Sequence, residues 1–137
     1  MIKDILIKKV QDVVLAVLPQ IQDPESTIWE VYLINLQQDA LVNVLVSSRG
    51  FRIEDGQETK TSVLRHYFEE IGPVSYQMIE HIQAEVFSLH NEYWVTFNQK
   101  EPDDYLFDKK FTFVAESIHE DNFTDIPLIG RKGVMIG

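Results

Sequence analysis

Cysteine is absent from this chain of 137 residues. The absence excludes a disulfide framework, a thiolate zinc site and a cysteine nucleophile, and it fits a reducing compartment. A chain of this length can bury one hydrophobic core without disulfides or a structural metal. We therefore expect a single domain over residues 1–137, and we predict no cofactor.

Long apolar runs are also missing. Charged residues, among them Asp4, Lys8, Lys9 and Asp12, interrupt the N-terminal segment MIKDILIKKVQDVVLAVLPQ. No apolar run therefore approaches the ~18 residues of a membrane span. No small-x-small cleavage site follows, as a signal peptide would require. These absences predict a cytoplasmic protein with no membrane partner.

Positive charge is scarce. The chain has 12 Lys and Arg against 22 Asp and Glu, a formal net charge of -10. Such an acidic chain disfavours non-specific binding to nucleic acid. Residues 66–125 hold thirteen acids and three bases, whereas residues 47–65 hold four bases and three acids, a net of +1. Residues 47–65 are therefore slightly basic in a chain that is acidic as a whole, and they are called the basic segment below.

Two stretches have apolar residues at the three- and four-residue steps of an amphipathic helix. The first covers residues 2–18 and stops at Pro19. The second covers residues 63–71, behind a candidate N-cap at Thr61 or Ser62. These patterns predict two helices, each with one buried face.

The remaining patterns predict strands, because apolar and polar residues alternate or because both alternate faces are apolar. The segment 28–36 is apolar on both faces, which is typical of a central strand. We expect it to pair in a hairpin with the next strand. Asp55-Gly56 predicts a type I′ turn. The predicted strands are 28–36, 41–47, 51–54, 57–59, 76–89, 93–98 and 105–115, the last three of them as an antiparallel meander.

The predicted order is therefore α-β-β-(hairpin)-α-β-β-β. This order indicates an α+β two-layer sandwich, a mainly antiparallel sheet of about five to seven strands with two helices packed on one face. Residues 126–137 form an apolar tail. We expect this tail to dock on the body or on another chain, since a free apolar end would be sticky.

The strings WEVYLINL, VNVLVSSRGF, KTSVLRHYFEEI, NEYWVTF and DKKFTFV together span most of the chain. With them the sequence resembles a small family of uncharacterised bacterial α+β proteins. The resemblance implies a single α+β domain. It implies no activity, ligand or site residue.

The basic segment is the first candidate site, for an anion. Arg49, Lys60, Thr61, Ser62 and His66 flank or follow the predicted start of the second helix. Unpaired backbone N–H groups and the positive end of the helix dipole favour phosphate or carboxylate there. The pattern G-x-x-x-x-G-K-[ST] is absent, so the segment is no P-loop. The competing interpretation is a solvated hairpin that ends in capping residues.

Catalytic and metal chemistry have little support. His66 and Glu70 have the i, i+4 spacing of two ligands on a helix, but a closed metal site needs three or four. No G-x-S-x-G elbow occurs. We assign no catalytic residue and no metal site.

Trp94 is the candidate surface aromatic. It alternates with Glu92 and Thr96, whereas its neighbour Tyr93 must face the other side of the strand. Together with Arg131 and Lys132 in the tail, Trp94 is the predicted interaction surface.

Two function classes remain open. The favoured one is a non-catalytic binding module for a protein partner, or a homodimer formed through a sheet edge or the tail. An acidic domain of this size could neutralise a basic partner. The alternative is a small anionic-ligand-binding domain, or a small hydrolase, that uses the basic segment before the second helix.

Overall fold

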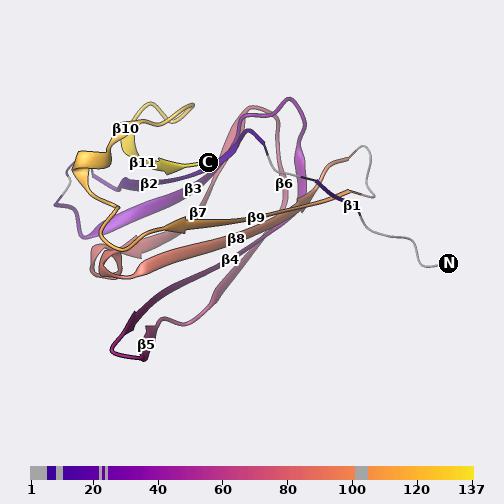
Figure 1. The fold of residues 1–137 in the computed structure, drawn as a ribbon. Coiled ribbons are helices and arrows are strands. Elements are labelled where there is room, and N and C mark those ends of the chain that lie inside the picture. Colours follow the sequence, from indigo (N-terminus) through magenta and orange to yellow (C-terminus); the bar gives the residue numbers. More distant parts are fainter. Residues whose placement is uncertain (1–5, 9–10, 22, 24, 101–104) are drawn as a thin grey trace.

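The computed structural model, which describes residues 6–8, 11–21, 23, 25–100 and 105–137, consists of two β-sheets packed face to face (Figure 1). In spatial order, sheet 1 contains β1 (Leu6–Lys8), β9 (Tyr105–Phe113), β8 (His90–Asn98), β4 (Leu41–Glu54) and β5 (Gln57–Lys60), with β6 (Leu64–Ile71) also paired to β4. Sheet 2 contains β10 (Thr124–Asp125), β11 (Lys132–Ile136), β2 (Val13–Pro19), β3 (Ile28–Asn35) and β7 (Ser75–Gln83). Neighbouring strands are antiparallel, except that β1 runs parallel to β9.

The main core lies between the two sheets. Alternate residues of each strand point inward, so Leu15, Val31 and Leu33 of sheet 2 share one buried cluster with Val44 and Phe97 of sheet 1. Trp29 closes one end of this core, where it meets Phe87 and Phe123 edge to face. Period-two alternation thus accounts for the packing of both sheets.

The predicted first helix, residues 2–18, is wrong. Residues 6–8 and 13–19 are strands β1 and β2, and residues 1–5, 9 and 10 lie outside the described residues. In β2 the run Val13 to Leu18 is apolar on both faces, and both faces are covered. Such a continuous apolar run suits a doubly buried strand as well as a helix, and its β-branched valines favour the strand.

The predicted second helix, residues 63–71, is also wrong. Residues 64–71 form β6, which pairs with β4 from Leu41↔Ile71 to Ser48↔Leu64. The pairing satisfies an edge of β4 that a helix would have left open. Here a tertiary partner overrides a local helical pattern.

No α-helix occurs in the part of the chain that the structure describes. Its helical elements are the 3₁₀ turns η1 (Ala84–Ser88) and η2 (Glu120–Asn122). The α+β sandwich with two packed helices, which the residue patterns predicted, is therefore wrong, and so is the α+β class that the resemblance implied. The described residues likewise contain no helix long and apolar enough to cross a membrane.

The strands themselves were predicted better than their pairing. β3 is central and buried, as expected, and β8 and β9 form the expected antiparallel pair. However, β3 does not form a hairpin with β4, because the two strands lie in different sheets. β7 likewise pairs with β3 rather than with β8, so the predicted meander is divided between the sheets.

The C-terminal tail docks on its own chain. β11 pairs with β2 from Val134↔Val17 to Ile136↔Leu15. Ile126 and Ile129 pack on the outer face of sheet 2 against Ala16, Leu18 and Tyr32. This contact gives sheet 2 a second, smaller apolar cluster outside the main core.

Candidate functional site

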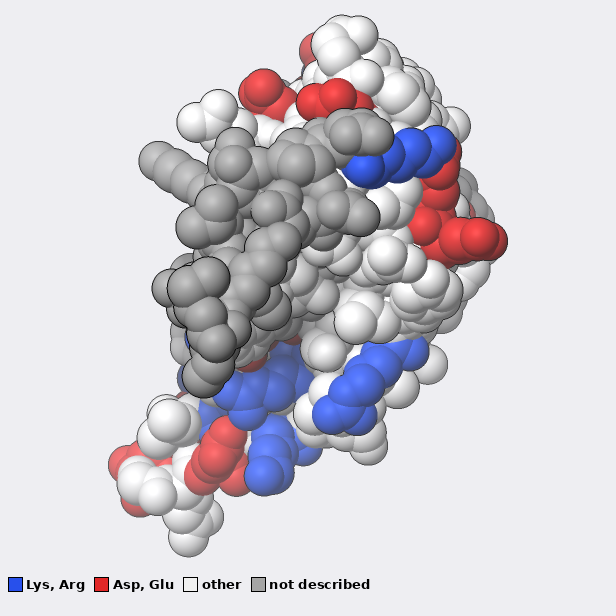
Figure 2. Space-filling model, turned by 90° about the vertical axis from the view of Figure 1, so that its right-hand side faces the viewer, with Lys and Arg blue, Asp and Glu red and all other residues white. Residues whose placement is uncertain are grey.

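The basic segment is the end of β4 and its hairpin with β5, which projects at the bottom of Figure 1. Asp55 and Gly56 both have positive φ, 50° and 77°, and Glu54 pairs with Gln57. The predicted type I′ turn is confirmed. From the side, basic side chains gather at the base of this hairpin and acidic ones near its tip (Figure 2).

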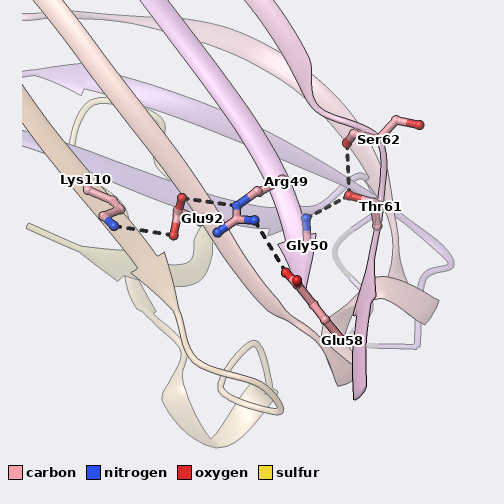
Figure 3. A network of polar contacts seen from close by, with 7 residues as sticks. All are labelled: Arg49, Gly50, Glu58, Thr61, Ser62, Glu92 and Lys110. Atoms are coloured by element: carbon pink, nitrogen blue, oxygen red, sulfur yellow. Dashed lines mark hydrogen bonds and ion pairs between the residues drawn. The ribbon is translucent and has the colours of Figure 1, made fainter. Parts of the chain in front are cut away.

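After the hairpin, two successive strands, β5 and then β6, pair with different parts of β4. β5 pairs with Phe51 to Glu54, β6 pairs with Leu41 to Ser48, and residues 61–63 join these two strands. At the joint, the Gly50 N–H donates to Thr61 Oγ1 at 2.8 Å (Figure 3). The Thr61 N–H donates in turn to the Gly50 carbonyl at 2.9 Å. Thr61 therefore holds the joint rather than capping a helix.

Two of the four bases of the segment, Arg49 and Arg52, are paired with acids. Arg49 lies 3.4 Å from Glu92 and 3.7 Å from Glu58, and Lys110 lies 3.7 Å from Glu92 (Figure 3). Arg52 lies 2.7 Å from Glu54. Since no helix follows, the dipole on which the predicted anion site depended is missing.

The structure does not gather the predicted anion-binding residues around one point. Arg49, Thr61 and Ser62 line a common cavity, but Lys60 is exposed on β5 and His66 is hydrogen-bonded to Glu80. The prediction of anion binding depended on a helix N-terminus after the basic segment, and the structure has a strand there instead.

The cavity lies where residues 61–64 depart from β4, beside β7 and η1, and has a volume of about 340 Å³. Apolar side chains in its lining include Leu64, Ile82 and Val86. Polar residues in its lining include Ser48 and Glu80. The cavity thus joins one edge of each sheet.

Glu80 is the centre of a buried polar network. Its side chain is only 8% exposed. Glu80 Oε1 accepts hydrogen bonds from Ser48 Oγ at 2.9 Å and from His66 Nε2 at 2.7 Å, and Oε2 accepts one from the Tyr93 hydroxyl at 3.1 Å. A buried carboxylate is costly unless it is hydrogen-bonded, so these donors allow Glu80 to sit between the sheets.

The same network affects the pKa of Tyr93. Burial, followed by the charge of Glu80 and its hydrogen bond, raises the pKa of Tyr93 well above the ordinary value. The hydroxyl therefore keeps its proton and continues to donate to Glu80 near neutral pH.

His66 and Glu70, the pair with the spacing of two metal ligands on a helix, have separate partners in the structure. His66 bonds Glu80, whereas Glu70 lies 2.9 Å from Lys100. Within the described residues, no group of three or more His, Cys, Asp or Glu could hold a metal ion.

The outer face of sheet 1 carries exposed apolar side chains on three neighbouring strands. Trp94 on β8 is 45% exposed, Leu45 on β4 is 52% exposed and Tyr67 on β6 is 57% exposed. Cross-strand register places Leu45 beside Tyr67, and Trp94 beside Ser47 in the next row. The predicted exposure of Trp94 is confirmed, and its role as an interaction residue stays a prediction.

Basic residues stand at both ends of the row of Trp94. Arg65 and Trp94 both pair with Ser47, and Lys110 pairs with Trp94 across β8 and β9. The Lys110 ammonium lies 5.4 Å from the Trp94 ring centroid, and the Trp94 indole N–H donates to Asp108. Leu45, Tyr67 and Trp94, bordered by Arg65 and Lys110, are called the aromatic face below.

Arg131 and Lys132 do not belong to the aromatic face. The Arg131 guanidinium donates to Glu30 Oε1 at 2.8 Å and to the Tyr32 hydroxyl at 3.2 Å, on the outer side of sheet 2. Burial lowers the pKa of Arg131, but its contacts with Glu30 and Tyr32 outweigh this effect and raise it. Lys132 pairs with Asp125 at 3.6 Å. The structure therefore does not bring these two residues together with Trp94.

Sequence reasoning did not single out Glu80, Ser48 or Tyr93 as a group. Their contacts join β7 to β4 and β8, and therefore depend on how the two sheets pack. The available signal was Glu80 itself, an acid at a position of β7 that faces the core. The sequence alone could not identify that position as facing the core, because this depends on the pairing of β7 with β3.

No protein-family model matches the chain, and no curated protein sequence does. Among solved structures, the sporulation control protein Spo0M from Bacillus subtilis is similar at 8% sequence identity and a TM-score of 0.29. The match covers 77% of this chain and 49% of Spo0M, so the chain spans about half the length of that protein. At this TM-score the similarity carries no argument about fold or function.

Proposed function

We propose that this protein is a non-catalytic binding module that recognises a protein partner through its aromatic face. The observation that carries the proposal is the contiguous exposure of Leu45, Tyr67 and Trp94 on three adjacent strands. Contiguous exposed apolar side chains on a folded protein mark interaction surfaces more often than scattered ones do.

The residue types support this use of the face. Trp, Tyr and Arg are the residues most often found at the energetic centres of protein interfaces. Trp94 and Tyr67 bring large rings with few rotatable bonds, so ordering them on binding costs little entropy. Within the described residues, Arg65 has no ion pair and remains available to a partner's carboxylate.

The flanking charges suggest the chemistry of the partner. Arg65, which has no ion pair among the described residues, and Lys110, which lies 3.7 Å from Glu92, border the Trp94 row, although the chain as a whole is acidic. A partner that offers an apolar side chain flanked by carboxylates would match both features. Electrostatic complementarity of this kind favours one orientation and speeds association.

Site-specific cross-linking tests the proposal. A photoreactive amino acid replaces Thr96, which lies between Leu45 and Asp108 on the aromatic face. In a second protein it replaces Tyr76, which is 47% exposed on β7 in sheet 2. We expect a discrete cross-linked protein from position 96 and none from position 76.

The cross-linked partner is then purified and its affinity measured directly. Trp94→Ala should weaken binding by about 2 kcal/mol, as expected for a central aromatic residue, whereas Tyr76→Ala should leave the affinity unchanged. Equal losses from the two variants would contradict the proposal. A cross-link between two copies of this chain would replace the partner with a homodimer.

A further inference from the structure

The cavity beside Glu80 has the features of a small-molecule site that is separate from the aromatic face. Its volume of about 340 Å³ is at the lower end of the range of ligand pockets. Its lining combines apolar residues, which include Leu64, Ile82 and Val86, with the polar residues Ser48, Thr61 and Ser62.

Glu80 supplies the specific polar group of this cavity. A carboxylate has about four acceptor positions. Ser48, His66 and Tyr93 use three of those positions and hold the side chain in place. Glu80 also lines the cavity, and its side chain is only 8% exposed.

The charges around the cavity favour a cation. Glu80 and Glu85 both line it. Arg49 lines it too, but its guanidinium pairs with Glu58 and Glu92. The net charge of -10 adds a negative field over the whole molecule. An anion would therefore meet Glu85, which has no ion pair among the described residues, whereas a cation would meet the acceptor position of Glu80 that Ser48, His66 and Tyr93 leave open.

We propose that this cavity binds an alkylammonium or alkylguanidinium group, with Glu80 as the counter-ion and Leu64, Ile82 and Val86 packed against the short aliphatic stem. Such a group exists as a free amine and also as the Lys or Arg side chain of another protein. The chemistry at Glu80 is the same in both cases, because a charge-assisted hydrogen bond forms with the carboxylate.

Calorimetry and amide NMR titrations of the full chain test the proposal. The probes are n-butylammonium and n-butylguanidinium, with n-butanol as the neutral control and butyrate as the anionic control. Nα-acetyl-lysine amide and Nα-acetyl-arginine amide represent side chains of a partner protein. We expect the cations to bind and to shift the amides of Ser48, Gly50 and Leu64, which line the cavity.

Glu80→Gln keeps the shape and removes the charge, so it should raise the Kd of the cations by about tenfold or more. Glu69→Gln is the matched control, because Glu69 is an exposed acid of β6 outside the cavity lining. It should change the Kd less than about twofold. Ser62→Trp blocks the exposed rim without touching the Glu80 network, and it serves if Glu80→Gln does not fold.

Three results would overturn the proposal: no binding of any cation, equal binding of n-butanol or butyrate, or cation binding unchanged in both Glu80→Gln and Ser62→Trp. The remaining arms identify the source of the ligand. Tighter binding of the simple amines supports a free ligand. Tighter binding of the acetylated amino-acid amides supports a side chain of a partner protein.

Discussion

The outer faces of the two sheets differ in what covers them. On sheet 2, Ile126 and Ile129 of the tail pack over Ala16, Leu18 and Ile34. On sheet 1, the side chains of Leu45, Tyr67 and Trp94 remain 45–57% exposed. Both outer faces are apolar in part, but within the described residues only the outer face of sheet 2 has a segment of the chain packed over it.

This difference separates stability from function. Burying a large apolar side chain contributes about 1.5–3 kcal/mol, so the tail turns the outer face of sheet 2 into part of the folded core. The aromatic face of sheet 1 contributes little to folding while it stays exposed. Its apolar side chains are therefore available to a partner.

The largest effect is expected where the tail meets sheet 2. A Cβ added at Gly133 would collide with the Val17 carbonyl oxygen and with Leu18. Gly133→Ala should therefore push β11 away from β2 and lower the free energy of unfolding by about 3 kcal/mol. Urea unfolding measures the loss. Gly72→Ala is the control, because a Cβ there meets only Ser75 Oγ at 3.6 Å, and an equal loss from it would show that the clash is not the cause.

A smaller loss in the free energy of unfolding is expected when Ile126, a tail residue that packs over sheet 2, is truncated. Ile126 is only 2% exposed, so Ile126→Ala should lower the free energy of unfolding by about 2 kcal/mol. Leu128 lies in the same turn but is 46% exposed, and Leu128→Ala should change it by less than about 0.5 kcal/mol. Equal losses would mean that Ile126 does not act as a cover.

The two buried tyrosines, Tyr93 and Tyr32, should make the stability of the protein depend on pH in the alkaline range. Burial, then the Glu80 charge, raises the pKa of Tyr93, and burial, then the Glu30 charge, raises the pKa of Tyr32. Both groups ionise more readily in the unfolded chain, near pH ~10. Their contribution to stability is therefore complete below that pH and is lost as the pH rises toward the folded pKa.

For Tyr93 the loss should reach about 1.4 kcal/mol per pH unit above pH ~10. Urea unfolding at a series of alkaline pH values should show this slope in the parent and a shallower one in Tyr93→Phe. An unchanged slope in Tyr93→Phe would contradict the raised pKa.

The smallest effect is expected on the aromatic face. Leu45→Ala removes a side chain that is 52% exposed and should change the free energy of unfolding by less than about 0.5 kcal/mol. Thermal or urea unfolding beside Ile126→Ala makes the comparison direct. A loss as large as that of Ile126→Ala would mean that Leu45 is buried in solution, for example against a second copy of the chain.

Local sequence patterns predicted the features that depend on neighbouring residues. Asp55-Gly56 predicted the hairpin turn because few residue pairs accept positive φ at both positions. Alternation with Glu92 and Thr96 predicted that Trp94 points outward. In each case the evidence lies within a few residues, and no distant segment competes with it.

The helix predictions failed because a distant segment did compete. Residues 13–18 are apolar on both strand faces, and that pattern also contains a helical stripe. Residues 63–71 contain such a stripe as well, but β4 offers a free edge to residues 64–71. Backbone pairing across the sheet decided between the two structures, and no local window contains that information.

By itself, then, the sequence determined strands β3, β4, β5, β7, β8 and β9, the hairpin turn, the acidic charge and the absence of cysteine chemistry. Only the tertiary structure decided which strands share a sheet, which outer face the tail covers, and that Glu80 meets Ser48, His66 and Tyr93. The physical reason is the sequence separation over which each interaction acts. Turn geometry and alternation act between neighbours, whereas sheet pairing and burial join residues far apart in the chain.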